Sequence, residues 1–161
     1  MSKPERFDLA TEIWQEAYRH QMQGELDRAI ELYRRSIEVC PTAEAHTFLG
    51  WTYSFQGRLD EATQECMRAI EVDPDFGNPY NDIGCYLMQQ GKLEEAVPWL
   101  ERAKLAKRYE PRQFPFMNLG RIYAAKGMVV RAIAEFEQAL KLAPDEPTCL
   151  ASLAQLRAML N

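Results

Sequence analysis

The chain has 161 residues, of which 47% are hydrophobic and 27% charged, a composition typical of a globular protein that folds without disulfides. Nineteen Lys and Arg against 24 Asp and Glu give a formal net charge of -5. An acidic chain repels phosphate backbones, so we expect no nucleic-acid partner. No stretch approaches the roughly 18 apolar residues that a membrane-spanning helix requires, so we also expect no membrane insertion.

Few residues of the chain suggest chemistry. The start, MSKPERFDLATEIW, lacks the apolar core of a signal peptide, which predicts a cytoplasmic location. The four cysteines form no CxxC pair, and His20 and His46 do not lie at ligand spacing from them, so we expect reduced thiols and neither metal nor cofactor. Phosphate-binding loops, GxSxG elbows and HExxH motifs do not occur. The sequence therefore predicts a protein that is not an enzyme.

One pattern recurs four times at a spacing close to 34 residues. A small residue is followed seven residues later by a glycine, and five residues after that by an alanine. The small residues are Ala17, Gly50, Gly84 and Gly120; the glycines are Gly24, Gly57, Gly91 and Gly127; the alanines are Ala29, Ala62, Ala96 and Ala132. A glycine in this place ends one helix and begins another, so each unit is predicted to be a pair of helices.

This pattern resembles the tetratricopeptide repeat over residues 10–146. The second copy shows it best, with Leu49, Gly50, Tyr53 and Gly57 in register. The resemblance implies an all-α fold, a right-handed superhelix of four helical hairpins plus a C-terminal capping helix. In such arrays the apolar faces are buried between neighbouring repeats, and the superhelix has a concave side.

In chain order, a lead-in precedes four repeats and a capping helix. The expected boundaries are 1–9 for the lead-in, 10–42, 43–76, 77–112 and 113–146 for the repeats, and 147–161 for the capping helix. The third repeat has 36 residues because of a basic insertion, KRYEPRQ, and we expect its second helix to run long, with a modest bend at Pro98. The basic residues here indicate either a solvated helix end or a surface for an acidic flank of a partner: Lys104, Lys107, Arg108 and Arg112.

The capping helix carries four leucines, and its outward face is only weakly polar. The leucines are Leu150, Leu153, Leu156 and Leu160, and the few polar residues of the outward face are Ser152, Gln155 and Arg157. A capping helix normally turns a polar face outward. This face is therefore a candidate contact for a homodimer.

The resemblance implies that the first helix of each repeat lines the concave groove through its second, fifth, ninth, twelfth and thirteenth positions. The candidate groove residues are Trp14, Tyr18, Thr47, Trp51, Phe55, Asn78, Asn81, Cys85, Met88, Phe114, Met117 and Arg121. Aromatic and methionine walls with a few amides suit an extended peptide. The sequence thus predicts a non-catalytic protein–protein interaction adaptor that binds a peptide segment of a partner protein. Trp14 and Tyr18 could instead pack beneath the N-terminal segment with Phe7 and Leu9.

Two other functions stay open. The stretched third repeat, with Tyr109, Glu110 and Pro111 before the next helix, is loosely similar to the pilotins of type IV pili, although the cysteine-bearing leader and the extra repeats of those lipoproteins are not expected here. A pilotin-like assembly factor and a structural homo-oligomer are therefore the alternatives. The clamp for acidic chaperone tails needs Lys and Asn at the fifth and ninth positions, where the first repeat has Trp14 and Tyr18, so we do not expect that activity.

Overall fold

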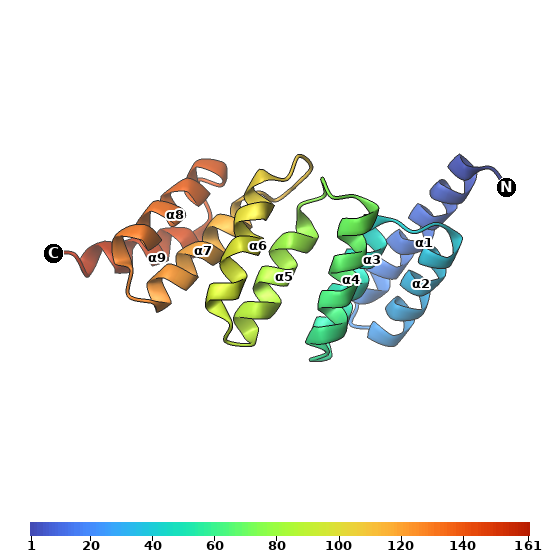
Figure 1. The fold of residues 1–161 in the computed structure, drawn as a ribbon, viewed down its shortest axis with the longest axis horizontal. Helices are drawn as coiled ribbons and strands as arrows, with labels where there is room; N and C mark the ends of the chain where they lie inside the picture. The colour runs from blue at the N-terminus through green and yellow to red at the C-terminus, as the bar shows by residue number, and fades with distance from the viewer.

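The computed structural model describes all residues, 1–161, as nine helices without a β-strand, stacked one after another along the molecule (Figure 1). The helices are α1 (Lys3–Met22), α2 (Leu26–Val39), α3 (Ala43–Phe55), α4 (Leu59–Val72), α5 (Asn78–Gln89), α6 (Leu93–Leu105), α7 (Gln113–Ala125), α8 (Val129–Leu142) and α9 (Pro147–Ala158). The predicted all-α array of helical hairpins is confirmed. None of the nine helices combines the length and hydrophobicity needed to span a bilayer.

Each hairpin turns at a glycine in the left-handed conformation. The four φ angles are 80°, 74°, 77° and 74°, at Gly24, Gly57, Gly91 and Gly127. Any side chain would strain the backbone at such an angle, which is why glycine recurs at this place in the pattern. The predicted turns are therefore confirmed, and they fix four pairs: α1 with α2, α3 with α4, α5 with α6, and α7 with α8.

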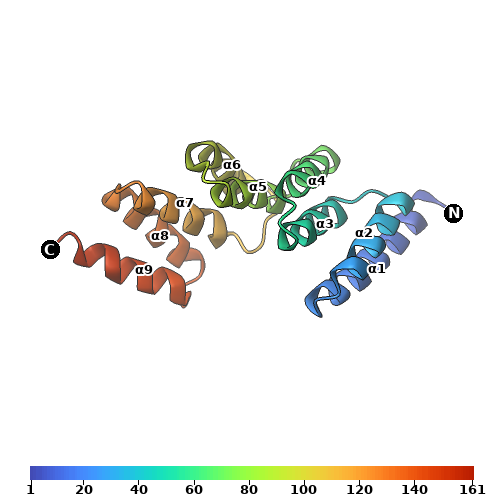
Figure 2. The same cartoon turned by 90° about the horizontal axis from the view of Figure 1, so that it is seen from below.

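The pairs stack into an arch. Figure 2 shows α3 and α5 on its inner side, α4 and α6 on its outer side, and the two termini at opposite ends. Helices contact mainly their neighbours in the chain. The core accordingly has two main clusters, one around Tyr33 and Leu49 in the N-terminal half and one around Leu100 and Phe136 in the C-terminal half.

The first helix begins earlier than the repeat pattern predicts. α1 starts at Lys3, so most of the expected lead-in, residues 1–9, is helical. Ser2 and Glu5 form a capping box: the Ser2 hydroxyl accepts from the Glu5 N–H at 3.2 Å, and the Glu5 carboxylate accepts from the Ser2 N–H at 2.6 Å. Pro4 in the first turn favours the same start. These signals lie outside the repeat, which is why its pattern does not include them.

The insertion in the third repeat forms a loop, so the expectation of a longer second helix is wrong. α6 has 13 residues and ends at Leu105 because the Arg112 guanidinium donates to the carbonyls of Lys104 and Ala106, both at 2.9 Å. The remaining residues, 106–112, make the α6–α7 loop. Guanidinium bonds to the last carbonyls of a helix take the place of a further turn.

The α6–α7 loop folds back onto the turn between α4 and α5. Arg108 donates its N–H to the Asp75 carbonyl and accepts from the Gly77 N–H, both at 2.9 Å. The Tyr109 ring is buried against Gly77, where an added Cβ would come within 2.6 Å of the tyrosine side chain. The loop therefore joins the second, third and fourth repeats along one edge of the array.

The basic cluster of this loop is tied to carboxylates of other elements. Lys104 lies 2.9 Å from Glu135 on α8. Arg108 lies 2.8 Å from Glu44 on α3 and 2.7 Å from Asp73 at the end of α4, and the bond from Arg108 lowers the pKa of Asp73. Their positive charges are therefore largely neutralised within the chain.

Candidate functional site: the concave groove

An aromatic pair lies on α3, one of the helices of the inner side of the arch (Figure 2). Trp51 and Phe55 stand one turn apart on α3, with ring centroids 5.1 Å apart. Trp51 is partly buried, while Phe55 is 56% exposed. The predicted groove residues Phe114, 39% exposed, and Arg121 are also exposed, both on α7. These four side chains present contact area in the unbound chain.

The rings of Trp14 and Tyr18 rest on the second repeat. Their centroids lie 5.4 and 5.3 Å from that of Phe48 on α3. Phe7, which was the expected cover in the alternative interpretation, is itself 49% exposed. The indole Nε1 of Trp14 is buried without a hydrogen-bond partner. Trp14 and Tyr18 thus form an aromatic cluster with the next repeat.

The candidates at the fifth position of the later repeats are buried. Thr47 is 1% exposed, Asn81 7% and Met117 2%, so the expectation that they present side-chain area to the groove is not met. The physical reason is the stacking, because the following element covers this position. Met117, for example, belongs to the core cluster that includes Cys149 and Leu153 of α9.

A row of polar side chains crosses from α5 to α7. The Asn118 amide nitrogen donates to Asn81 Oδ1 at 3.0 Å and lies 3.2 Å from the Sγ of Cys85. Arg121 donates to Asn118 Oδ1 at 2.8 Å. Burial raises the pKa of Cys85 to about 12, so the thiol is neutral and not a nucleophile at ordinary pH. Asn118 therefore fixes the orientation of the predicted residues Cys85 and Arg121.

The other two predicted groove residues, Asn78 and Met88, lie near opposite ends of α5. Both are partly buried. The Oδ1 of Asn78 is buried without a hydrogen-bond partner, and Met88 packs against the C-terminal core. Their part in binding, like that of the exposed candidates, stays a prediction.

Sequence reasoning missed the sixth position of these helices. This position holds Phe48, Asp82 and Asn118, each two residues before the small residue of its repeat. Asp82 is partly buried and makes no hydrogen bond or ion pair within the chain, and burial raises the pKa of its carboxyl to about 7. The sequence does contain a signal for this position. Asp82 is an acidic residue that stands between Asn81 and Cys85, two predicted groove residues that lie on the same helical face.

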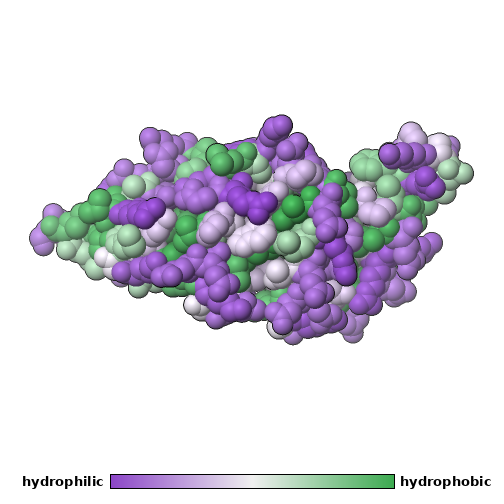
Figure 3. All heavy atoms as spheres, viewed as in Figure 1, coloured by the Kyte–Doolittle hydropathy of each residue, from purple (hydrophilic) through white to green (hydrophobic).

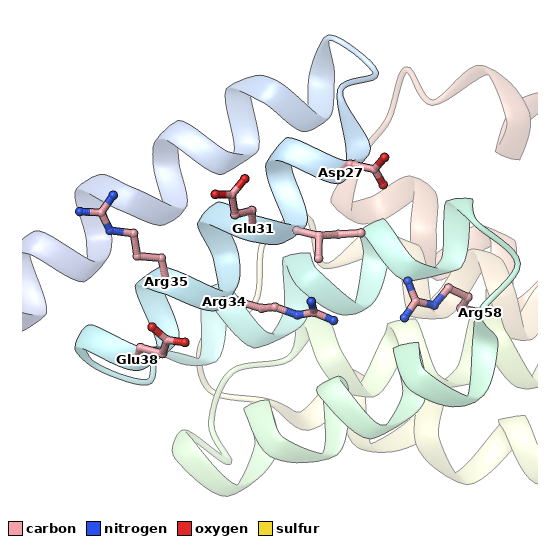
Figure 4. A pocket seen from close by; sticks show the side chains of 7 residues that line it. Asp27, Glu31, Arg34, Arg35, Glu38 and Arg58 are labelled. Carbon is pink, nitrogen blue, oxygen red and sulfur yellow. The ribbon is translucent and has the colours of Figure 1, made fainter.

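Two hollows lie on the outer side of the arch, between α2 and α4. They adjoin each other there, with volumes of about 540 and 450 Å³, and neither is lined by a predicted groove residue. We call them the α2–α4 cleft. The first is lined by Asp27, Ile30, Glu31, Arg34, Arg35, Glu38 and Arg58 (Figure 4). Hydrophilic residues also predominate over the surrounding face (Figure 3).

Several charged groups of the α2–α4 cleft have partners within the chain. Arg34 donates to the Tyr53 hydroxyl at 2.7 Å, and the Arg58 guanidinium lies 4.2 Å from the centroid of the same ring. The buried carboxylate of Glu65 lies 2.7 Å from the His46 ring and also receives Arg68. No three His, Cys, Asp or Glu side chains in the chain gather as a metal site would require. Part of the charge in the cleft is thus neutralised by contacts within the chain.

Several solved structures share this fold. PilF from Pseudomonas aeruginosa has 25% identity and a TM-score of 0.88, over 94% of this chain and 69% of that one. PilW, a type IV pilus biogenesis factor, has 18% identity and a TM-score of 0.84, over 94% and 70%. YrrB, a tetratricopeptide protein with an unusual peptide-binding site, has 21% identity and a TM-score of 0.67, over 91% and 75%. The last two likenesses concern the fold alone.

No curated protein matches the sequence. Family models of the tetratricopeptide repeat match residues 43–76, 80–105 and 114–146, which together make up more than half of the chain. Each match falls on helix pairs that turn at a left-handed glycine. With its repeats recognised both in sequence and in structure, the chain belongs to the tetratricopeptide repeat family.

Proposed function

We propose that the protein is a non-catalytic adaptor that holds an extended segment of another protein in its concave groove. The observation that carries this proposal is the partly exposed aromatic pair Trp51 and Phe55 on α3, a helix of the inner side of the arch. Rigid aromatic side chains supply large contact area at low entropic cost, and such anchors dominate binding energy when a partner buries them.

Other residues of the first helices support the same use. Phe114 on α7 adds a second exposed ring, and the exposed Arg121, which bonds Asn118, adds a hydrogen-bond donor. Apolar anchors with a few fixed polar groups are typical of peptide-binding surfaces. Family membership supports a protein-interaction adaptor, and the related fold of YrrB carries a peptide-binding site.

The test is the double substitution Trp51→Ala, Phe55→Ala. Truncating a buried aromatic anchor costs about 2 kcal/mol, so partner binding should weaken about thirtyfold. Partners are captured from the source cell with the wild-type chain, and their affinities are then measured by titration. Circular dichroism should show unchanged helix content, because neither side chain belongs to the buried core.

A matched control removes apolar area of similar exposure elsewhere. Leu105 is 84% exposed and Val130 71%, and neither lies on the inner helices. The variant Leu105→Ala, Val130→Ala should bind as the wild type does. Equal binding by the groove variant and this control would exclude the groove as the binding surface.

A second candidate, a pilotin-like assembly factor, is favoured by the likeness to PilF over 94% of the chain and to PilW in fold. Such a factor would use the same adaptor surface for components of a pilus or secretion machine. Loss of surface pili on deleting the gene, restored by the wild type, would support it. The proposed cytoplasmic location is tested at the same time by cell fractionation.

Self-association through α9 is the third candidate. Leu150 is 50% exposed and Met159 64%, and both lie at the C-terminal end of the array. A two-fold contact between copies of this helix would cover them. Light scattering decides between monomer and dimer, and a dimer that persists in the Ala151→Glu, Met159→Glu variant would place the contact elsewhere.

A further inference from the structure

The sixth position of each first helix packs against the preceding repeat in one register. Phe48 lies on Trp14 and Tyr18, which are the fifth and ninth positions of the first repeat. Asn118 likewise contacts Asn81 and Cys85, which hold those positions in the third repeat. Two independent junctions thus show the same arrangement.

The junction between these two follows the same register. By this register we infer that the Asp82 side chain of α5 faces Thr47 and Trp51 of α3, two helices that are in contact. The Thr47 hydroxyl donates within its own helix, to the Ala43 carbonyl at 2.7 Å. Asp82 makes no hydrogen bond or ion pair within the chain and is partly buried.

No cation of the chain reaches this carboxyl. Arg121, the guanidinium of the inner face on α7, donates instead to Asn118. Lys104 near the end of α6 is paired with Glu135, and Arg108 of the α6–α7 loop is paired with Glu44 and Asp73. A partly buried carboxylate without a partner is costly, and an incoming positive charge would offset that cost.

We propose that the groove selects segments that carry a lysine or arginine, whose cationic head group is received by the Asp82 carboxylate. This inference rests on the proposed function and specifies the chemistry of the partner. The Trp51 ring, which this register places next to Asp82, favours the same ligand, because a cation over an aromatic face is attracted by the ring. The net charge of -5 also favours encounter with a basic segment.

The site predicts a pH dependence with a definite sign. The pKa of Asp82 is raised to about 7 by burial, so the carboxyl is mostly ionised at pH 8 and mostly protonated at pH 6. A cationic ligand needs the ionised form, and one group with this pKa gives a Kd about tenfold higher at pH 6 than at pH 8.

The other titratable groups around Asp82 do not change charge in this interval. They are Cys66 of α4, Cys85 and Tyr86 of α5, and Tyr109 of the α6–α7 loop, and burial raises the pKa of each. By the same register α3 faces Asp82 with Thr47 and Trp51, which do not titrate, and Arg121 of α7 donates to Asn118. The change of Kd with pH is therefore assigned to Asp82.

An array of random nonapeptides, blocked at both ends, tests the selection. Peptides with Lys or Arg should be enriched on the wild-type chain. A selected lysine peptide and its norleucine counterpart are then titrated at pH 8 against the wild type, Asp82→Asn and Asp145→Asn. Asp145 lies exposed in the turn before α9, makes no ion pair, and carries the same change of charge.

We expect Asp82→Asn to weaken the lysine peptide about tenfold, to leave the norleucine peptide unchanged and to abolish the pH dependence. Asp145→Asn should bind as the wild type does. Unaltered binding of the lysine peptide by Asp82→Asn, or an array without Lys or Arg enrichment, would overturn the inference. The proposed groove would then still stand if Trp51→Ala, Phe55→Ala weakened binding. If that double variant bound every selected peptide normally, groove binding and this inference would both fall.

Discussion

Two carboxyl groups, Glu65 on the outer side of the arch and Asp82 on the inner side, stand in opposite electrostatic situations. Glu65 is 6% exposed and is held by His46 and Arg68. Asp82 is partly buried and is held by nothing. Glu65 therefore has partners within the chain, while Asp82 has none. This difference separates a carboxylate with a structural role from the one that we propose for a ligand.

The same contrast extends to the aromatic residues of the two sides. Tyr53 is 4% exposed, with Arg34 on its hydroxyl and Arg58 over its ring. Trp51 and Phe55, on the same helix, contact each other and leave Phe55 largely in water. The same helix thus carries a buried, hydrogen-bonded tyrosine on one side and a partly exposed aromatic pair on the other.

The largest expected effect is the loss of Glu65. Glu65→Ala removes the buried acceptor of both His46 and Arg68, so it should lower the free energy of unfolding by about 3 kcal/mol. Urea denaturation measures this loss. Glu61→Ala is the matched control, since Glu61 is an exposed partner of Arg58, and it should unfold at the urea concentration of the wild type. A Glu65→Ala variant as stable as the control would show that the contacts of Glu65 with His46 and Arg68 do not stabilise the fold.

The replacement Asp82→Asn should act in the opposite direction. The pKa of Asp82 is about 7 in the folded chain against an ordinary value of 3.8, so the folded state holds this proton more tightly than the unfolded state. Stability of the wild type therefore falls as the pH rises from about 4 to about 7. At pH 8 the shift corresponds to at most about 4 kcal/mol, and contact with water reduces the expected gain for Asp82→Asn to about 2 kcal/mol.

Thermal unfolding at several pH values measures this gain, which should shrink below pH 7 and vanish near pH 4. Asp145→Asn, with the same change of charge at an exposed site, should show no such trend. A destabilised Asp82→Asn variant at pH 8 would mean that the carboxylate has a partner in the folded chain after all.

The smallest effect is expected at Tyr53. Tyr53→Phe removes the hydroxyl that accepts from Arg34 and keeps the ring beneath Arg58, so it should cost about 1 kcal/mol. A double-mutant cycle with Arg34→Ala isolates the contact. A coupling energy of zero would show that the α2–α4 cleft is held by packing alone.

The fold could be predicted where the responsible signal lies within the repeat. The left-handed turns follow from single glycines such as Gly57, because a positive φ is a property of the residue itself. The start of α1 and the end of α6 depend on Ser2 with Glu5 and on Arg112, which belong to no repeated position. Periodicity carries no information about such contacts.

The groove was harder to predict, because exposure of a helical position depends on the next repeat. The spacing places Trp51 and Phe55 on one helical face, and the structure confirms that they lie together. The same reasoning places Thr47 and Met117 in the groove, but stacking buries them. Asp82 and Asn118 were missed for the same cause, since their surroundings come from a helix more than thirty residues away in the chain.

The α6–α7 loop has a consequence for how this array can change in evolution or by engineering. Repeats that contact only their neighbours can be duplicated, deleted or exchanged one at a time. Here deletion of the third repeat would remove the Arg108 that Glu44 and Asp73 bind, together with the Arg108 N–H that donates to the Asp75 carbonyl. The second and third repeats, the latter including the α6–α7 loop, therefore form a single module that must be inherited or transplanted whole.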